Sequence, residues 1–258
     1  MMWPRNPKLI FLSLVLALTG LILYYTLYSS QDDQTNVAPL PEITENEPEG
    51  MAKNVEPSVN ELPKKVLIEN APFTSQAPFA DWDDPRQQDG CEEASVLMAM
   101  KWLRNEGLTK QQALDEILAM SAFELEKYGE FHDTSSQDTA DRLFKNYYKY
   151  DKVRVRYDIG IDDIKKELAA GNLVIVPADG RKLGNPNFTG DGPERHKLVI
   201  KGYDENRQIF ITNDPGTRKG EGYQYNYQVL ISAVRDYPTG YKVPIVDERK
   251  AMIVVERG

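Results

Sequence analysis

Cysteine and histidine are nearly absent from this chain. Its 258 residues include one cysteine, Cys91, and two histidines, His132 and His196. A single cysteine excludes a disulfide framework within the chain, and it also excludes a cysteine-rich zinc site. With so few sulfur and imidazole ligands available, we expect no metal centre and no bound cofactor.

Positive charge is also scarce. The chain holds 31 lysines and arginines against 40 aspartates and glutamates, which gives a net charge of −9. Proteins that bind nucleic acid present clustered cationic side chains that neutralise phosphates, and no long run of lysine or arginine occurs here. We therefore expect no nucleic-acid partner.

Residues 9–28, LIFLSLVLALTGLILYYTLY, contain no charged side chain. A helix of about 20 apolar residues can cross the hydrocarbon core of a bilayer. Arg5 and Lys8 precede the run and acids follow it, an asymmetry that places the N-terminus in the cytoplasm. A cleaved signal peptide would have an apolar region of about 7–15 residues and a small-x-small cleavage site, and no such site follows this run. Residues 1–30 are therefore predicted to be a cytoplasmic stub and an uncleaved transmembrane signal anchor.

Residues 31–63 form an acidic segment with eight acids and one lysine. They are rich in proline, glutamate and asparagine and almost free of aromatic residues, so they cannot bury enough apolar surface to fold. We predict a disordered linker that ties the anchor to an extracytoplasmic domain at 64–258.

The pattern within 64–258 predicts helices first and strands later. A run that is apolar on nearly every side covers 91–106, Thr109 and Gln112 form a capping box before a second helix, and Ser135 or Ser136 caps a third. A short strand is expected at 66–70. The later strand patterns are VRVRYD, LVIVPAD, HKLVIKGYD, IFITNDP and AMIVVER, with a short helix at 161–171. This order predicts an α+β fold in which helices pack on an antiparallel sheet.

Cys91 follows the turn dipeptide Asp89-Gly90 and opens the apolar helix. A thiol at a helix N-terminus lies at the positive end of the helix dipole, which lowers its pKa and favours the nucleophilic thiolate. A lone cysteine is otherwise most often a small buried hydrophobe. Taken alone, the position of Cys91 is compatible both with a nucleophile and with a small buried apolar residue.

His196 begins the strand HKLVIKGYD, where alternation places it on the same face as Leu198 and Ile200. A turn at 204–207 joins this strand to IFITNDP in a hairpin, which brings Asn213 or Asp214 near the imidazole. A nucleophilic cysteine needs a base and a group that orients the base. The order of cysteine, histidine and Asn/Asp is more specific than any one of these signals.

Four segments resemble the C39-like peptidase family of the papain superfamily. They are PFTSQAP (72–78), DGCEEASVLMAMKWL (89–103), RHKLVIKGYD (195–204) and IFITNDPGT (209–217), and the resemblance spans roughly residues 66–257. It implies a papain-like fold in which the central helix carries the nucleophile and packs on an antiparallel sheet.

The resemblance also implies site residues. Cys91 would be the nucleophile, His196 the general base and Asp214 the orienting residue. Gln76 would donate a hydrogen bond to the oxyanion, as an amide does in other acyl-transfer sites, and Gln87 and Gln88 compete with it for that role.

Glu92 and Glu93 stand where many members of that family have Gly-Pro. A carboxylate pointing at the sulfur would raise the thiol pKa. Successive side chains point in different directions around a helix, so we expect both glutamates to point away from Cys91 and to stabilise the helix start. The Gly/Pro-rich segment 181–195 is expected to be a loop that overhangs the site.

These features predict a membrane-anchored, extracytoplasmic cysteine peptidase or amidohydrolase. Its substrate would be a peptide or protein, including a cell-wall peptide, and cleavage would pass through a thioester on Cys91. Two other functions remain open: a non-catalytic papain-like module that binds peptides or a partner at the cell surface, and acyl transfer to an amine by the same residues.

Overall fold

The computed structural model describes residues 61–245 and 248–257. The predicted anchor and nearly all of the predicted linker lie outside these residues. Within the described ranges, no helix combines the length and the apolar character that a membrane crossing requires.

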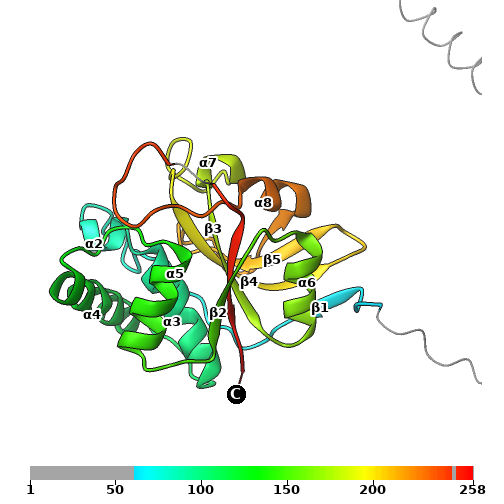
Figure 1. Cartoon of the computed structure of the whole chain (residues 1–258), viewed down its shortest axis with the longest axis horizontal. Coiled ribbons are helices and arrows are strands. Elements are labelled where there is room, and N and C mark those ends of the chain that lie inside the picture. Colours follow the sequence, from blue (N-terminus) through cyan, green and yellow to red (C-terminus); the bar gives the residue numbers. More distant parts are fainter. Residues whose placement is uncertain (1–60, 246–247, 258) are drawn as a thin grey trace, which may run out of the picture. The chain divides into compact units, whose positions relative to one another are not determined.

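One antiparallel sheet organises the described part of the chain (Figure 1). Its strands are β1 (Lys65–Leu67), β2 (Val153–Tyr157), β3 (Leu173–Ala178), β4 (His196–Asp204), β5 (Ile209–Asn213), β6 (Tyr223–Asn226) and β7 (Ala251–Val255). Their spatial order is β2-β7-β3-β4-β5-β6, and β1 pairs with β4. The first strand ends earlier than the predicted 66–70, and Asn70 adopts a left-handed φ of 61° that extended backbone does not tolerate.

The helices mostly follow the predicted order. They are α2 (Pro85–Gln88), α3 (Cys91–Leu103), α4 (Lys110–Tyr128), α5 (Ser136–Asp138), the π-helix η1 (Thr139–Tyr147), α6 (Ile161–Ala169), α7 (Gly180–Leu183) and α8 (Tyr227–Ala233). The capping box is confirmed, since Thr109 Oγ1 accepts from Gln112 N at 3.2 Å. Ser135 rather than Ser136 caps α5, and the helix predicted beyond it continues as a π-helix.

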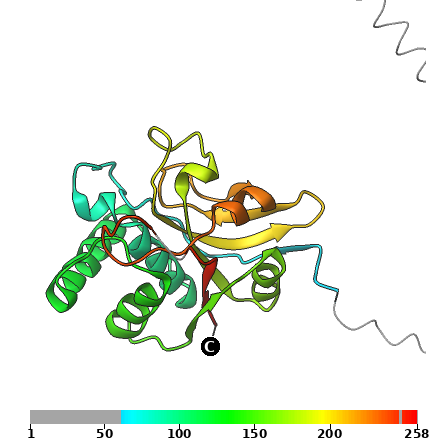
Figure 2. The same cartoon turned by 45° about the horizontal axis from the view of Figure 1, so that its top comes forward.

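Both faces of the sheet are buried. Along β3, Leu173 and Ile175 pack with α3, α4 and η1, whereas Val174 and Val176 pack with α6 and α8. Figures 1 and 2 show α2 to α5 gathered on one side of the sheet, with α6 and α8 on the other. The predicted α+β class, with helices on an antiparallel sheet, is confirmed.

Helix α3 is the central helix of this arrangement. It contains no glycine or proline and is rich in alanine, leucine and methionine, which favour helix. Nearly all of its residues are buried, because α4 and η1 cover one side and the sheet covers another. Its first residue, Cys91, lies where β4 begins, since the backbone N–H of Lys197 reaches the Cys91 sulfur.

Candidate active site

Cys91 opens α3 at the end of a tight turn. A Cβ at Gly90 would lie 2.7 Å from the carbonyl oxygen of Arg86, so the turn before the helix accepts only glycine there. The Cys91 side chain is 2 % exposed, and its remaining exposure faces a cavity of about 920 Å³. The chain thus presents its single thiol at a helix N-terminus, at the bottom of a cleft.

His196 and Asp214 form a buried pair at neighbouring ends of the adjacent strands β4 and β5. The β4–β5 register pairs Val199 with Asn213, which leaves Asp214 just past the end of β5, near the first residue of β4. His196 Nε2 and Asp214 Oδ1 are 2.7 Å apart, and both side chains are essentially inaccessible to solvent. Asn213 points elsewhere, because its amide donates to the carbonyls of Ala71 and Pro72.

Asp214 is ionised in the fold. Burial alone would raise its pKa, but His196 beside it and hydrogen bonds from the Tyr225 hydroxyl (2.6 Å) and the Gly216 N–H (3.0 Å) lower the pKa below its ordinary value. A carboxylate that accepts from Nε2 leaves Nδ1 of His196 as the free acceptor nitrogen.

The imidazole is held on two further sides. The Phe188 ring meets it edge to face, with centroids 5.4 Å apart. A Cβ at Gly216 would lie 2.8 Å from His196 Cε1, so a glycine is required for the loop to pass this close. These contacts fix the orientation of the imidazole relative to the cleft.

Cys91 and His196 line the same cavity. Its walls come from the segment before α3, from Asp133 between α4 and α5, from residues 186–189 and 192–195, and from residues 216–219 after Asp214. The Gly/Pro-rich loop predicted to overhang the site does line the cleft, and its first residues form α7.

The expectation that both glutamates point away from Cys91 is wrong for Glu92. The Cys91 thiol donates to Glu92 Oε2 at 3.0 Å, and both side chains are buried. The glutamate side chain is long enough to turn back toward the first residue of the helix. It does so because Lys197 of β4, which binds the other carboxylate oxygen, lies next to the sulfur.

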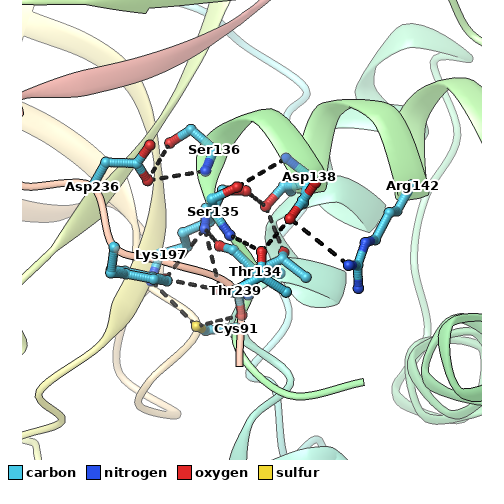
Figure 3. A network of polar contacts seen from close by, with 12 residues as sticks. Cys91, Thr134, Ser135, Ser136, Asp138, Arg142, Lys197, Asp236 and Thr239 are labelled. Atoms are coloured by element: carbon cyan, nitrogen blue, oxygen red, sulfur yellow. Dashed lines mark hydrogen bonds and ion pairs between the residues drawn. The ribbon is translucent and has the colours of Figure 1, made fainter. Parts of the chain in front are cut away.

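Lys197 is the main partner of Glu92 and was not predicted as a site residue. It is fully buried, its Nζ lies 3.2 Å from Glu92 Oε1, and it also donates to the carbonyl of Thr134. The Tyr237 hydroxyl and the Thr134 N–H complete the set, donating to Glu92 Oε1 at 2.8 and 3.2 Å. Figure 3 shows Lys197 beside Thr134, with the Cys91 sulfur next to the Lys197 backbone.

Burial raises the pKa of the Cys91 thiol well above its ordinary value, and the negative charges of Glu92 and Asp133 raise it further. The Glu92 carboxylate is ionised, because Lys197 and the hydrogen bonds from Cys91 and Tyr237 outweigh burial and lower its pKa. In this arrangement the sulfur is a thiol that donates to a carboxylate.

The structure places Gln76 beside the cleft with its amide nitrogen engaged. Gln76 Nε2 donates to the backbone carbonyls of Gln87 and Gln88 at 3.0 and 2.7 Å. Both amide hydrogens therefore brace the turn before α3. Gln76 and Gln88 line the cavity with Cys91, and Gln87 is buried outside that lining.

A comparison with known protein families gives a match over most of the described residues. A model of the Peptidase_C39 like family matches residues 68–241, which is more than half of the chain. The chain belongs to the Peptidase_C39 like family. It is accordingly a cysteine peptidase, and the candidate residues Cys91, His196, Asp214 and Gln76 all lie within the matched range.

A comparison with solved structures gives two similar proteins. This C39-like peptidase is similar to a protein described as a C39-like peptidase from Bacillus anthracis, with 18% identity, a TM-score of 0.47, and coverage of 75% of this chain and 98% of the other. It is also similar to xylellain, a cysteine protease from Xylella fastidiosa, with 14% identity, a TM-score of 0.44, and coverage of 85% and 95%. No curated protein matches the chain.

Cys91, Glu92 and Asp133 in this C39-like peptidase each offer a metal-ligand atom within 4.8 Å of the others. The Glu92 oxygens are already bound by Lys197, Tyr237, Thr134 and Cys91. A metal ion there would have to displace a buried ammonium group. The cluster is therefore better described as an ion pair beside a thiol.

Two further buried acids, Glu93 on α3 and Glu124 on α4, lie close to each other. Glu93 on α3 accepts from the Ser121 hydroxyl at 3.2 Å, while Glu93 Oε2 and both Glu124 oxygens have no hydrogen-bond partner in the described part of the chain. Arg142 approaches Glu124 Oε1 only to 3.8 Å. Burial and the charge of Glu92 raise the pKa of Glu124 to about 8, so it stays protonated at neutral pH.

Glu124→Gln is expected to stabilise the protein at pH 8 and to change little at pH 5. The pKa of Glu124 is higher in the folded state than in the unfolded state. Its favourable contribution to the free energy of unfolding is therefore complete below about pH 4.5 and disappears as the pH rises through 8. The loss amounts to about 1.4 kcal/mol per pH unit. Between pH 4.5 and pH 8 the loss adds up to about 4–5 kcal/mol, so at pH 8 the variant should melt roughly 8–20 °C above the wild type.

Calorimetry at pH 5 and pH 8 measures this difference. Glu126→Gln, at an exposed position on the same helix, is the matched control and should change the melting temperature equally little at both pH values. A Glu124→Gln effect of the same size at pH 5 and pH 8 would show that Glu124 does not titrate in the fold.

Proposed function

We propose that this C39-like peptidase hydrolyses peptide or amide bonds through a thioester on Cys91, with His196 as general base and Asp214 as the residue that orients it. The observation that carries the proposal is the buried His196–Asp214 pair, with 2.7 Å between Nε2 and Oδ1, on the wall of the cavity that also contains Cys91. A base held by a carboxylate beside a helix-start thiol is the arrangement that nucleophilic cysteine catalysis requires.

In the acylation step, His196 Nδ1 takes the thiol proton while the sulfur attacks the substrate carbonyl carbon. The tetrahedral intermediate then expels the amine, which takes the proton from the imidazolium. In the second step, water attacks the thioester and gives a proton to His196. The tetrahedral intermediate then breaks its bond to sulfur, the carboxylic acid leaves, and the sulfur takes the proton back from the imidazolium.

The sulfur has to leave Glu92 before it attacks. A turn about the Cα–Cβ bond of Cys91 would exchange the carboxylate partner for the imidazole, and transfer of the proton to His196 places a cation beside the thiolate. The backbone N–H of Cys91 lies in the first turn of α3, where N–H groups have no partner within the helix, and it would serve as one donor to the oxyanion. Gln76 would be the other donor once its amide turns into the cleft.

We further propose that the enzyme works outside the cytoplasm, held by a signal anchor at 9–28. The uncharged apolar run and the two basic residues before it support this placement. A peptide or protein substrate, including a cell-wall peptide, fits an open cleft of this size.

A specific observation favours a non-catalytic module as the second candidate. The thiol donates to Glu92, and burial together with that carboxylate raises its pKa, which is unfavourable for a nucleophile. A module of this kind would bind a peptide in the cleft without cleaving it.

Replacing His196 by alanine separates the two candidates. We expect kcat/KM for a cleaved peptide to fall about 10²- to 10⁴-fold, because general acid–base catalysis contributes this much. His132→Ala, which removes the only other histidine, is the matched control and should change kcat/KM less than about threefold. Equal cleavage by the His196→Ala and wild-type proteins would refute the proposed role.

A further inference from the structure

Asp133 is a buried carboxyl group that the proposed mechanism does not use. It lies between α4 and α5, is 7 % exposed, and lines the cavity with Cys91. One of its carboxylate oxygens lies within 4.8 Å of the Cys91 sulfur. The backbone carbonyl of Asp133 accepts from Gly240 N at 2.8 Å. Among the residues that the structure describes, none donates a hydrogen bond to the Asp133 carboxyl group, which faces the cleft.

Asp89 adds a second carboxyl group to the same cavity. It is half-buried in the turn before α3, and its Oδ2 accepts from the Tyr241 hydroxyl. Burial raises the pKa of Asp89, and the negative charge of Glu92 opposes its ionisation further. Asp89, Glu92 and Asp133 therefore repel one another around the sulfur.

The neighbouring cations do not pair with Asp89 or Asp133. Lys197 lies 3.2 Å from Glu92 and forms an ion pair with it, and Arg195 donates to the carbonyl of Lys242 at 2.5 Å. Neither Asp89 nor Asp133 has an ion-pair partner within 4.0 Å among the residues that the structure describes. Burial, followed by the charges of Glu92 and Asp89, raises the pKa of Asp133 to about 8. An unpartnered buried carboxyl group is costly, and an incoming cation would satisfy it.

We propose that Asp133, together with Asp89, forms a subsite for an ammonium or guanidinium group of the substrate. The inference rests on the proposed function, since it assigns the specificity of the same cleft. Because Asp133 lies within 4.8 Å of the sulfur, the cation belongs to one of the two residues that flank the scissile bond. The rest of the cavity lining carries charges of both signs (Asp83, Glu194, Arg195, Arg218 and Lys219), so the subsite is assigned to the Asp89–Asp133 wall alone.

The potential beside Cys91 can be measured without turnover. Methanethiosulfonate reagents transfer a thioalkyl group to the sulfur, forming a disulfide and releasing methanesulfinate, and Cys91 is the single cysteine of the chain. The charge preference is the reaction rate of Cys91 with the trimethylammonioethyl reagent divided by its rate with the sulfonatoethyl reagent. This ratio is then divided by the same ratio for a small thiol free in solution. At pH 9, above the pKa of about 8 of Asp133, we expect a preference for the cationic reagent of at least about tenfold in the wild type.

Asp133→Asn should reduce this preference at least about fivefold, and Asp89→Asn should reduce it less. Asp81→Asn, which removes an exposed acid outside the cavity lining, should leave it unchanged. The wild-type preference should grow from pH 7 to pH 9, because Asp133 becomes negative as the pH passes its pKa of about 8, and it should grow less in Asp133→Asn. The groups that face Asp133 are Asp89, Cys91, Glu92, Arg195, Lys197, Tyr237 and Tyr241.

A matched peptide pair tests the subsite in turnover. A peptide with lysine next to the scissile bond should be cleaved with a kcat/KM at least about tenfold above that of its norleucine counterpart, and Asp133→Asn should remove the difference.

Three results would overturn the subsite: no preference for the cationic reagent, a preference that Asp133→Asn leaves intact, and no reaction of Cys91 with either reagent. An enzyme that loses activity in His196→Ala but shows no charge preference refutes the subsite alone, whereas a clear charge preference without any peptide cleavage refutes the proposed hydrolysis alone.

Discussion

Cys91→Ala is expected to lower kcat/KM for any peptide that the protein cleaves by at least about 10⁴-fold. The chain has no second thiol that could replace the nucleophile, and the two oxygens of Asp214 are bound by His196, Tyr225 and Gly216. Alanine keeps the helix and removes a sulfur, its hydrogen bond to Glu92 and the bond that it accepts from the Lys197 N–H. The loss should therefore be one of chemistry rather than of folding.

A thermal melt and a binding measurement accompany the assay. The variant should melt within a few degrees of the wild type, because each of these hydrogen bonds contributes about 1 kcal/mol. It should also bind the uncleaved peptide with an affinity close to that of the wild type. Residual cleavage above a tenth of the wild-type rate would exclude Cys91 as the nucleophile.

Lys197→Met is expected to destabilise the fold by about 3–5 kcal/mol. The methionine has a similar volume, but it leaves the Glu92 carboxylate buried without its cation and the Thr134 carbonyl without its donor. A loss of this size should lower the melting temperature by roughly 6–20 °C for a domain of this length.

Two variants serve as controls for this loss. Lys145→Met breaks the exposed pair between Lys145 and Asp141, whose members are 38% and 42% exposed, and should cost less than about 1 kcal/mol. The double variant Lys197→Met/Glu92→Gln removes the unpaired charge and should recover much of the stability. A Lys197→Met protein as stable as Lys145→Met would show that the buried pair is not ionised.

The sequence predicted much of the placement of Cys91, His196 and Asp214 because local signals determine it. The Asp89-Gly90 turn and the apolar run after it place Cys91 at the start of a buried helix. The strand pattern after His196 and the hairpin turn then bring Asp214 to the imidazole, with the pair separated by 2.7 Å. Periodicity alone left Asn213 and Asp214 as alternatives, and the register of β4 and β5 decided between them.

The Glu92–Lys197 pair was missed because periodicity does not report side-chain rotamers. The available signal was that Glu92 and Lys197 are charged residues in segments predicted to be buried. Burying either charge alone is costly, so buried charges are usually paired. Asp133 carried no periodic signal at all, because it lies in a connection between helices. The π-helix could not be predicted either, because its apolar residues Ala140, Leu143, Phe144 and Tyr147 follow the i, i+3, i+4, i+7 spacing of an amphipathic α-helix.

Rapid quenching of a turnover reaction, followed by mass spectrometry of the intact protein and of its Cys91 peptide, tests the central claim most directly. A nucleophilic Cys91 predicts a single adduct whose mass is that of the acyl half of the substrate, located on Cys91. The adduct should be absent in Cys91→Ala and lost on treatment with hydroxylamine, which cleaves thioesters. Steady turnover without any adduct on Cys91, or an unchanged adduct in Cys91→Ala, would contradict the account.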